Sequence, residues 1–237
     1  MSKNKKNTNK GRSKRTVFRK IKKDNPIEVK KNDRTEIEKH FGNIWTNDSK
    51  EKIRVMIKDT IDVFTKNNDT IFLFYGSLLG CARYGKILPW DGDVDFFVSY
   101  QNQPFKSFDD LQSMGYKLHG SPDSYRRIFT EDGLANTRGW TWPWIDFYIY
   151  EIKDDKVNFL IDKNKIFYSS DVKDVFPLQK KLFEDVEVNV PFVIDKHLDA
   201  IYPDWQNTCE SPKINHRIAR GYKKMIRVSI KEINFKC

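Results

Sequence analysis

The sequence predicts an α/β (α+β) fold in which helices flank a mixed β-sheet. Three observations indicate this class. Apolar residues from Ile53 to Phe64 recur at helical spacing. A continuous apolar run at 71–75 is typical of a strand buried on both faces. Several short stretches with strand-like patterns follow and are separated by a few helical ones, a mixture that favours a mixed sheet. The length of 237 residues suits one sizeable domain with a small appendage.

The elements are expected in a definite order along the chain. Asp48 or Ser49 begins the first helix by capping it, and Asn67-Asn68 ends it. After the strand at 71–75, the chain turns into a short helix at 78–84 and continues into a strand at 93–99. The remaining expected elements are a helix at 109–114, strands at 126–130, 145–150, 157–161 and 186–190, a helix at 196–201 and a further helix after residue 214.

The positive charge of the chain is concentrated at its N-terminus. Residues 1–23 hold 11 Lys and Arg and no Asp or Glu, whereas residues 24–237 hold 32 basic and 33 acidic side chains. Residues 1–32 are therefore expected to form a basic, disordered tail, and residues 33–237 the folded domain. Such a tail can contact nucleic acid, anionic lipid or another anionic partner, although a solvated arm is the favoured interpretation.

The composition also bears on the compartment. The sequence has no run of 18 apolar residues and no signal-peptide core, so a cytoplasmic protein without a transmembrane segment is expected. Its cysteines, Cys81, Cys209 and Cys237, are scattered and odd in number. Without a closely spaced pair they do not predict a structural zinc site, and they suit a reducing compartment.

Three aspartates at alternate positions form the main candidate site. In a strand, Asp91, Asp93 and Asp95 share one face, and the apolar residues between them share the other. Neighbouring carboxylates repel one another unless a cation lies between them, and hard oxygen ligands favour Mg²⁺ or Mn²⁺. A solvated acidic loop is the alternative, and for an isolated pattern of this kind it would be preferred.

The surrounding residues favour the metal site. Gly76 and Ser77 lie at a predicted helix start, where unpaired backbone N–H groups suit a phosphate. Arg83 adds a cation, and Trp90 follows a rigid proline. Asp146 is a lone charge in the aromatic strand WTWPWIDFYIY, where it needs a metal, a cation or a substrate hydroxyl as partner. Together these residues are the parts required for phosphoryl transfer.

The motifs then support a resemblance. The run YGSLLG from Tyr75, followed by Arg83, PWD at 89–91, Asp93 and Asp95, resembles the signature of the LicD/fukutin-related family. Later segments, VFPLQKKLFEDVEVNVP and LDAIYPDWQ, are similar to further blocks of that family. Gly92 and Pro203 depart from the pattern, since many relatives have an aspartate and a glycine there. The resemblance implies the nucleotidyltransferase fold of the DNA polymerase β superfamily.

The resemblance also implies an activity and residue roles. Family members transfer a phospho-alcohol group, such as phosphocholine or ribitol phosphate, from a CDP-linked donor to a hydroxyl of a glycan acceptor. By analogy, the catalytic residues Asp93, Asp95 and Asp146 hold Mg²⁺ or Mn²⁺, and Asp146 acts as a further ligand or as general base. The substrate-binding residues implied are Gly76, Ser77, Arg83 and Trp90.

Two other functions remain open at this point. A nucleotidyltransferase that moves a nucleoside monophosphate to RNA, a sugar phosphate or a small molecule would use the same carboxylates. A binding protein with a decayed site is disfavoured by the intact aspartates.

The roles of the remaining histidines, arginines and tryptophans are less specific. His216 and the other three histidines are expected to be structural or at the surface. The basic segment that contains Lys213, His216, Arg217 and Arg220 can also touch a substrate phosphate, although a solvated helix face is the favoured interpretation. One of Arg126, Arg127 and Arg138 can bind an anionic substrate, and Trp140, Trp142 and Trp144 suit stacking and core packing equally.

Overall fold

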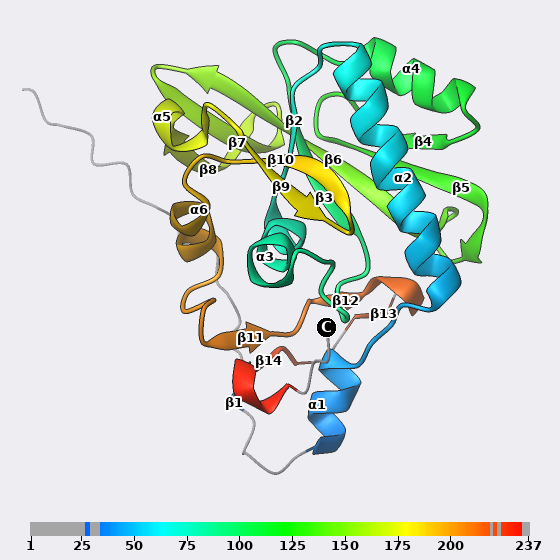
Figure 1. The fold of residues 1–237 in the computed structure, drawn as a ribbon, viewed down its shortest axis with the longest axis vertical. Coiled ribbons are helices and arrows are strands. Elements are labelled where there is room, and N and C mark those ends of the chain that lie inside the picture. The colour runs from blue at the N-terminus through cyan, green and yellow to red at the C-terminus, as the bar shows by residue number, and fades with distance from the viewer. Residues whose placement is uncertain (1–26, 29–33, 219, 222–223, 234–237) are drawn as a thin grey trace, which may run out of the picture.

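The computed structural model describes residues 27–28, 34–218, 220–221 and 224–233 of the 237-residue chain. Its centre is a seven-stranded sheet, shown in Figure 1. The strands are β2 (Ile71–Leu73), β3 (Val94–Ser99), β4 (Lys117–Gly120), β5 (Tyr125–Ala135), β6 (Thr141–Lys153), β7 (Lys156–Asp162) and β8 (Lys165–Asp171).

The sheet is mixed, as predicted. Its main path runs β2-β3-β6-β5-β4, and β7 and β8 extend it from the second half of β6. Strands β3 and β6 pair in parallel, whereas the other pairings in this sheet are antiparallel. The long β6 therefore contacts β3, β5 and β7, so a side chain in its middle lies at the centre of the sheet.

One face of the sheet is covered by α2 (Asn47–Lys66) and α4 (Phe105–Ser113). Thr46 caps α2, since its hydroxyl accepts from the Ser49 N–H and the Ser49 hydroxyl accepts from the Thr46 N–H. The helix thus begins slightly earlier than expected. Phe64 near its end stacks on Phe147 of β6 with ring centroids 5.7 Å apart, and Phe108 of α4 meets both rings edge-on. Burial of these rings holds the layer together.

The opposite face is covered by α3 (Tyr75–Tyr84) and α6 (Ile194–Ile201). Phe74 packs against Phe97 of β3 and Phe159 of β7, with centroids 4.8 and 4.5 Å apart. The strand expected at 71–75 is shorter than predicted because the chain already turns into α3 at Tyr75, which has a left-handed φ of 46°. The expected helix at 78–84 therefore starts three residues early.

Smaller elements complete the fold. They are α1 (Arg34–Phe41), α5 (Val172–Val175), the hairpin of β9 (Gln179–Phe183) and β10 (Val186–Val190), a sheet of β1 (Ile27–Glu28), β14 (Ile226–Ser229) and β11 (Thr208–Glu210), the pair β12 (Ile214–Asn215) and β13 (Arg220–Gly221), and two 3₁₀ turns, η1 (His216–Ile218) and η2 (Ile230–Glu232). Figure 1 shows α1, β1, β11 and β14 at one end of the molecule, away from α4.

Two expectations change in these segments. The helix expected after residue 214 is wrong, since the chain there forms β12 and a single 3₁₀ turn. Within the predicted tail, Ile27–Glu28 pair in parallel with β14. Residues 1–26 and 29–33, which carry the predicted basic arm, lie outside the described residues.

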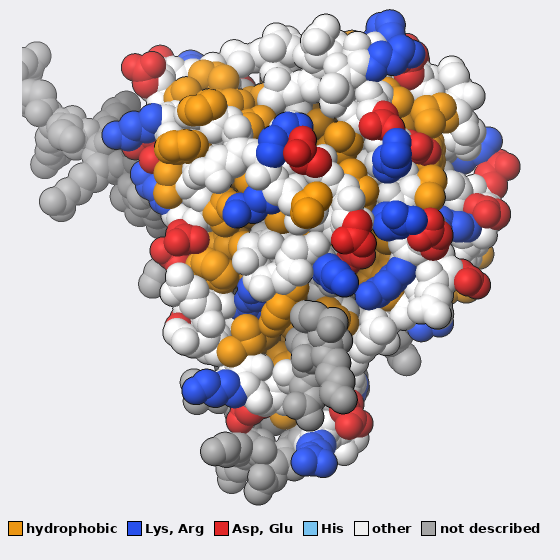
Figure 2. Space-filling view, viewed as in Figure 1, with side chains coloured by type: hydrophobic (Ala, Val, Ile, Leu, Met, Phe, Trp, Pro, Cys, Tyr) orange, Lys and Arg blue, Asp and Glu red, His pale blue; other side chains and the backbone are white. Residues whose placement is uncertain are grey.

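Figure 2 shows Lys and Arg side chains interspersed with Asp and Glu on one face, in keeping with the nearly balanced charge of residues 24–237. Among the helices that the structure describes, none is both long and apolar enough to cross a membrane.

Candidate active site

The parallel pairing of β3 with β6 brings the predicted carboxylates together. The register places Asp95 directly opposite Asp146, and Asp93 lies immediately before β3. All three side chains are buried, and each offers a carboxylate oxygen within 4.8 Å of the others. Residues more than fifty positions apart in the chain thus form one cluster on the face of the sheet opposite α2.

The electrostatics of the cluster fit a divalent cation. Burial, and then the charges of Asp93 and Asp146, hold the pKa of Asp95 well above its usual range. Burial and the charge of Asp93 raise the pKa of Asp91 to about 7. Each of these carboxyls therefore gives up its proton reluctantly in the absence of a cation. Three buried carboxylate oxygens are a donor set that Mg²⁺ or Mn²⁺ accepts, so the residues present fit such an ion.

Arg127 of β5 is the arginine that enters the site. It lies opposite Asp146 in the sheet, and its Nε and Nη2 donate to the two carboxylate oxygens of Asp146 at 2.7 and 2.6 Å. Its guanidinium also lies over the rings of Trp140 and Trp144, 4.6 and 4.2 Å from their centroids. This bidentate pairing fixes the orientation of the Asp146 carboxylate.

His216 is a site residue, although the sequence favoured a structural or surface role for it, with contact to a substrate phosphate only as an alternative. Its Nδ1 lies 2.8 Å from Oδ2 of Asp93, and its ring stacks on Trp144 with centroids 5.4 Å apart. Although burial acts in the opposite direction, the Asp93 carboxylate raises the pKa of His216 to about 9, so the imidazole is protonated at neutral pH. Gly92 permits this approach, since a Cβ there would lie 2.6 Å from Cβ of His216. The departure from the family pattern at Gly92 was the sequence signal that could have pointed to this contact.

Gly76 and Ser77 position the aspartates. The Ser77 hydroxyl accepts a hydrogen bond from the Asp95 N–H at 2.8 Å and is fully buried, so it joins α3 to β3. A Cβ on Gly76 would lie 2.0 Å from Oδ2 of Asp91, so only glycine leaves room for that carboxylate. Contact of either residue with a donor phosphate stays a prediction.

Arg83 is engaged within the protein. Its Nη2 donates to the carbonyl oxygens of Trp205 and Thr208, the latter at 2.6 Å, and its Nη1 donates to Sγ of Cys209 at 3.1 Å. The side chain therefore joins α3 to the segment that leads into β11. Trp90 is buried edge-on against Phe41, with centroids 5.0 Å apart. Their predicted contacts with substrate stay predictions.

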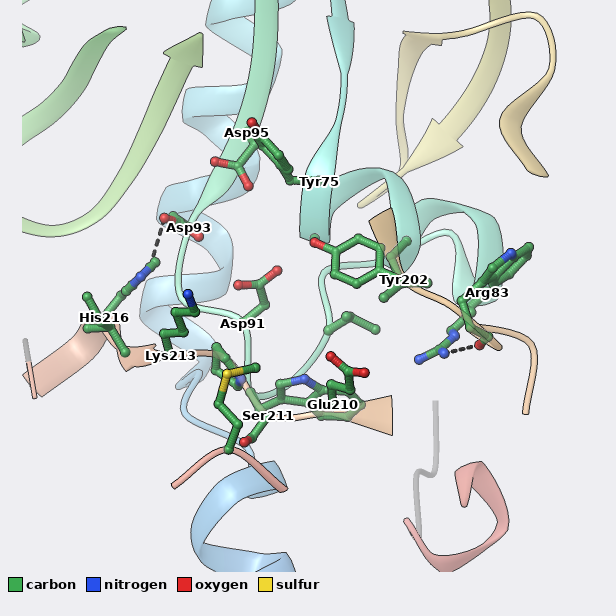
Figure 3. A pocket seen from close by; sticks show the side chains of 18 of the residues that line it. Tyr75, Arg83, Asp91, Asp93, Asp95, Tyr202, Glu210, Ser211, Lys213 and His216 are labelled. Carbon is green, nitrogen blue, oxygen red and sulfur yellow. Dashed lines mark hydrogen bonds and ion pairs between the residues drawn. The ribbon is translucent and has the colours of Figure 1, made fainter. Parts of the chain in front are cut away.

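A cavity of about 370 Å³ opens above the carboxylates. Figure 3 shows Asp91, Asp93 and Asp95 on one side of it, with His216 and Lys213 beside them, Tyr202 and Arg83 on the other side, and Glu210 and Ser211 below. The volume is within the range of small-molecule sites, and aromatic rings line much of the wall. The arrangement offers a carboxylate cluster that fits a divalent cation, with Asp93 and Asp95 in the wall of a ligand-sized cavity.

Comparison with known proteins identifies the family. Residues 68–192, more than half of the chain, match the nucleotidyltransferase domain of the LicD/FKTN/FKRP family. The chain belongs to this family. The match contains Asp93, Asp95 and Asp146 and confirms both the resemblance and the expected nucleotidyltransferase fold. The match ends at residue 192, before Lys213 and His216. The C-terminal segment that carries these two residues forms one wall of the cavity, and this wall therefore lies beyond the matched domain.

Curated relatives of this LicD-family chain come from Rickettsia. An uncharacterised protein of Rickettsia typhi is 28% identical over 155 residues, which are 63% of this chain and 45% of that protein. An uncharacterised protein of Rickettsia prowazekii is 27% identical over 158 residues, 63% of this chain and 53% of that one. The chain thus spans about half the length of the curated relatives it matches.

Two solved structures are similar to this chain at lower sequence identity than the curated relatives. The lincosamide antibiotic adenylyltransferase LnuA, with lincomycin bound, has 17% identity and a TM-score of 0.40 and covers 67% of this chain and 86% of its own. ANT(2″)-Ia, in complex with adenylyl-2″-tobramycin, has 13% identity and a TM-score of 0.43 and covers 65% of this chain and 81% of its own.

Proposed function

We propose that this LicD-family domain catalyses the metal-dependent transfer of a phospho-alcohol group from a CDP-linked donor to a hydroxyl of a glycan. The observation that carries the proposal is the buried cluster of Asp93, Asp95 and Asp146, of which Asp93 and Asp95 line a cavity of about 370 Å³. Membership of the family supports the donor class. Phosphocholine and ribitol phosphate are candidates for the transferred group.

The carboxylates supply the site for the cation. Asp93, Asp95 and Asp146 would hold Mg²⁺ or Mn²⁺, which when bound withdraws charge from the donor diphosphate and orients it. Arg127 keeps both oxygens of Asp146 turned toward its guanidinium, and this pairing favours the role of ligand over that of general base. Gly76 and Ser77 would present the start of α3 to a donor phosphate.

The transfer requires one new bond, one broken bond and a place for one proton. The acceptor oxygen bonds to the phosphorus of the phospho-alcohol, the bond from that phosphorus to the bridging oxygen breaks, and CMP leaves with that oxygen. The acceptor proton passes to a carboxylate. We assign this role to Asp91, whose side chain points into the cavity beside Asp93 in Figure 3.

The direct test is donor turnover. The protein is incubated with Mn²⁺, candidate glycans and CDP-choline, CDP-ribitol or CDP-glycerol, and CMP release is measured. We expect release with one donor, and a loss of about 100-fold or more in Asp95→Asn, since metal stabilisation of the transition state amounts to several kcal/mol. Turnover of a nucleoside triphosphate in place of every CDP-linked donor would contradict the proposal in favour of a nucleotidyltransferase.

A further inference from the structure

We propose that Lys213 is the cation that binds the diphosphate of the nucleotide-linked donor, and that Arg83 is not. The inference rests on the proposed function, because it deepens the description of the same cavity. Lys213 lies between β11 and β12, in the segment that forms the cavity wall beyond the matched family domain.

Most of the N–H groups of Arg83 donate within the protein, and its Nε, which has no partner among the described residues, is buried. Both of its terminal nitrogens donate to internal acceptors, the carbonyl oxygens of Trp205 and Thr208 and the sulfur of Cys209. Turning the guanidinium toward a phosphate would leave these partly buried acceptors without their charged donor, which is costly. Arg83 therefore serves to hold α3 against β11 and the residues just before it.

The other ionic side chains of the wall are also paired. Glu210 accepts from Arg227 of β14, with 2.9 Å between Oε1 and Nε. His216 lies against Asp93 at 2.8 Å. Both pairs neutralise charges within the wall, so neither Arg227 nor His216 offers a free cation to an anionic ligand.

Lys213 differs from these residues. It lines the cavity, its side chain is exposed, and within the part of the chain that the structure describes it makes no ion pair or hydrogen bond. Figure 3 shows its amino group directed into the cavity, toward the space between Asp91 and Asp93. A flexible stem that ends in a compact charge suits a phosphate oxygen.

The segment that carries Lys213 is held in place on both sides. Before it, the Ser211 hydroxyl accepts from the Ile226 N–H at 2.9 Å and the Ser211 N–H donates to the Ile226 carbonyl at 2.9 Å. After it, His216 is fixed by Asp93 and by the ring of Trp144. The position of Lys213 over the carboxylates therefore follows from the fold and not from a free loop.

A charge count shows why a further cation is needed. The four aspartates of the site carry four formal negative charges when ionised, and Arg127 and the imidazolium of His216 offset two of them. A divalent cation offsets the other two. A donor diphosphate brings additional negative charge, and Lys213 is the side chain placed to meet it.

The test measures binding of diphosphates and does not depend on turnover. Affinities of the full chain for inorganic pyrophosphate, CDP and cytidine are measured by calorimetry in the presence of Mn²⁺. We expect Lys213→Met to weaken pyrophosphate and CDP binding by about 10- to 100-fold, the loss of one charge-assisted hydrogen bond, with cytidine and Mn²⁺ binding unchanged. Lys213→Arg should restore most of the affinity, and Lys58→Met on the exposed face of α2 should have no effect.

The outcomes separate this inference from the proposed function. Equal pyrophosphate affinity in wild type and Lys213→Met would overturn the role of Lys213 and leave the proposed transfer intact. Weakened binding in Lys213→Met together with no CMP release from any CDP-linked donor would support Lys213 and contradict the proposed transfer. A wild-type protein that binds neither pyrophosphate nor CDP would contradict both.

Discussion

At the scale of single residues, the site depends on how the buried negative charge of Asp146 is compensated. This side chain is almost fully buried, and it is placed at the centre of the sheet by the register of β6 with β3 and β5. Burial of a carboxylate is unfavourable unless a cation pairs with it, and Arg127 provides that cation through two hydrogen bonds. Arg127 is thus a positioning residue that acts on the cluster through Asp146.

Removal of Arg127 should expose this dependence. We expect Arg127→Met to lower the free energy of unfolding by about 3–5 kcal/mol, the usual cost of leaving a buried ion unpaired. The double variant Arg127→Met with Asp146→Asn should recover much of this loss, because no charge is then left unpaired. Urea unfolding of the single and double variants without metal provides the comparison. Simple addition of the two single effects would show that the pair is not coupled.

At the scale of elements, the cavity depends on the attachment of α3 to its neighbours. Ser77 joins α3 to β3 through the Asp95 N–H, and Arg83 joins it to β11 through the Thr208 carbonyl. The first connection holds an aspartate at the base of the cavity, and the second holds the wall that carries Lys213. The YGSLLG motif and Arg83 therefore have structural tasks in addition to those that the resemblance implies.

Arg83→Met should accordingly act on stability more than on ligand affinity. We expect the free energy of unfolding to fall by roughly 2 kcal/mol, since carbonyl oxygens lose a charged donor. The pyrophosphate affinity of the folded variant should change by less than about threefold, the opposite of the pattern for Lys213→Met. Denaturant unfolding and calorimetry on the same preparation measure the two effects. A stable Arg83→Met protein with strongly reduced affinity would return the phosphate role to Arg83.

At the scale of the whole molecule, the core that supports the site contains a buried histidine. His197 of α6 is fully buried against Phe74, Phe159 and Tyr168. Burial lowers its pKa below the ordinary value of 6.5, although the Asp174 carbonyl and carboxylate act in the opposite direction and Lys196 adds to the lowering. The folded protein therefore binds fewer protons than the unfolded chain just below pH 6.5.

This difference predicts an acid-dependent loss of the part of the stability that His197 contributes. Because the unfolded state takes up the proton first, the contribution of His197 to the free energy of unfolding should fall as the pH drops below about 6.5, by at most about 1.4 kcal/mol per pH unit. The raised pKa values of Asp91 and Asp95 act in the opposite direction in the wild type and the variant alike, so the difference between their slopes reports on His197. The slope should decrease in His197→Asn, while His40, whose pKa burial also lowers, still contributes in both proteins. Urea unfolding between pH 5 and 7 measures this slope. Identical slopes would contradict the assignment to His197.

The sequence was sufficient for those parts of the molecule that local patterns encode. Alternation along the chain predicted a shared face for Asp93 and Asp95, with Asp146 as their partner on a neighbouring strand, and the structure brings the three carboxylates within 4.8 Å of one another. Boundaries were less certain because Tyr75 turns into α3 while still within an apolar run. The pairing of His216 with Asp93 and the choice of Arg127 depend on contacts between distant segments, which one sequence does not contain.

The central claim is that Asp93, Asp95 and Asp146 form a divalent metal site. The most direct measurement is the affinity of the purified protein for Mn²⁺ by calorimetry, in the wild type, in Asp95→Asn and in Asp62→Asn as an exposed control on α2. Wild type and Asp62→Asn should bind equally, and Asp95→Asn should bind at least about 10-fold more weakly. A wild type that binds neither Mn²⁺ nor Mg²⁺, or an Asp95→Asn protein that binds as tightly as the control, would contradict the assignment.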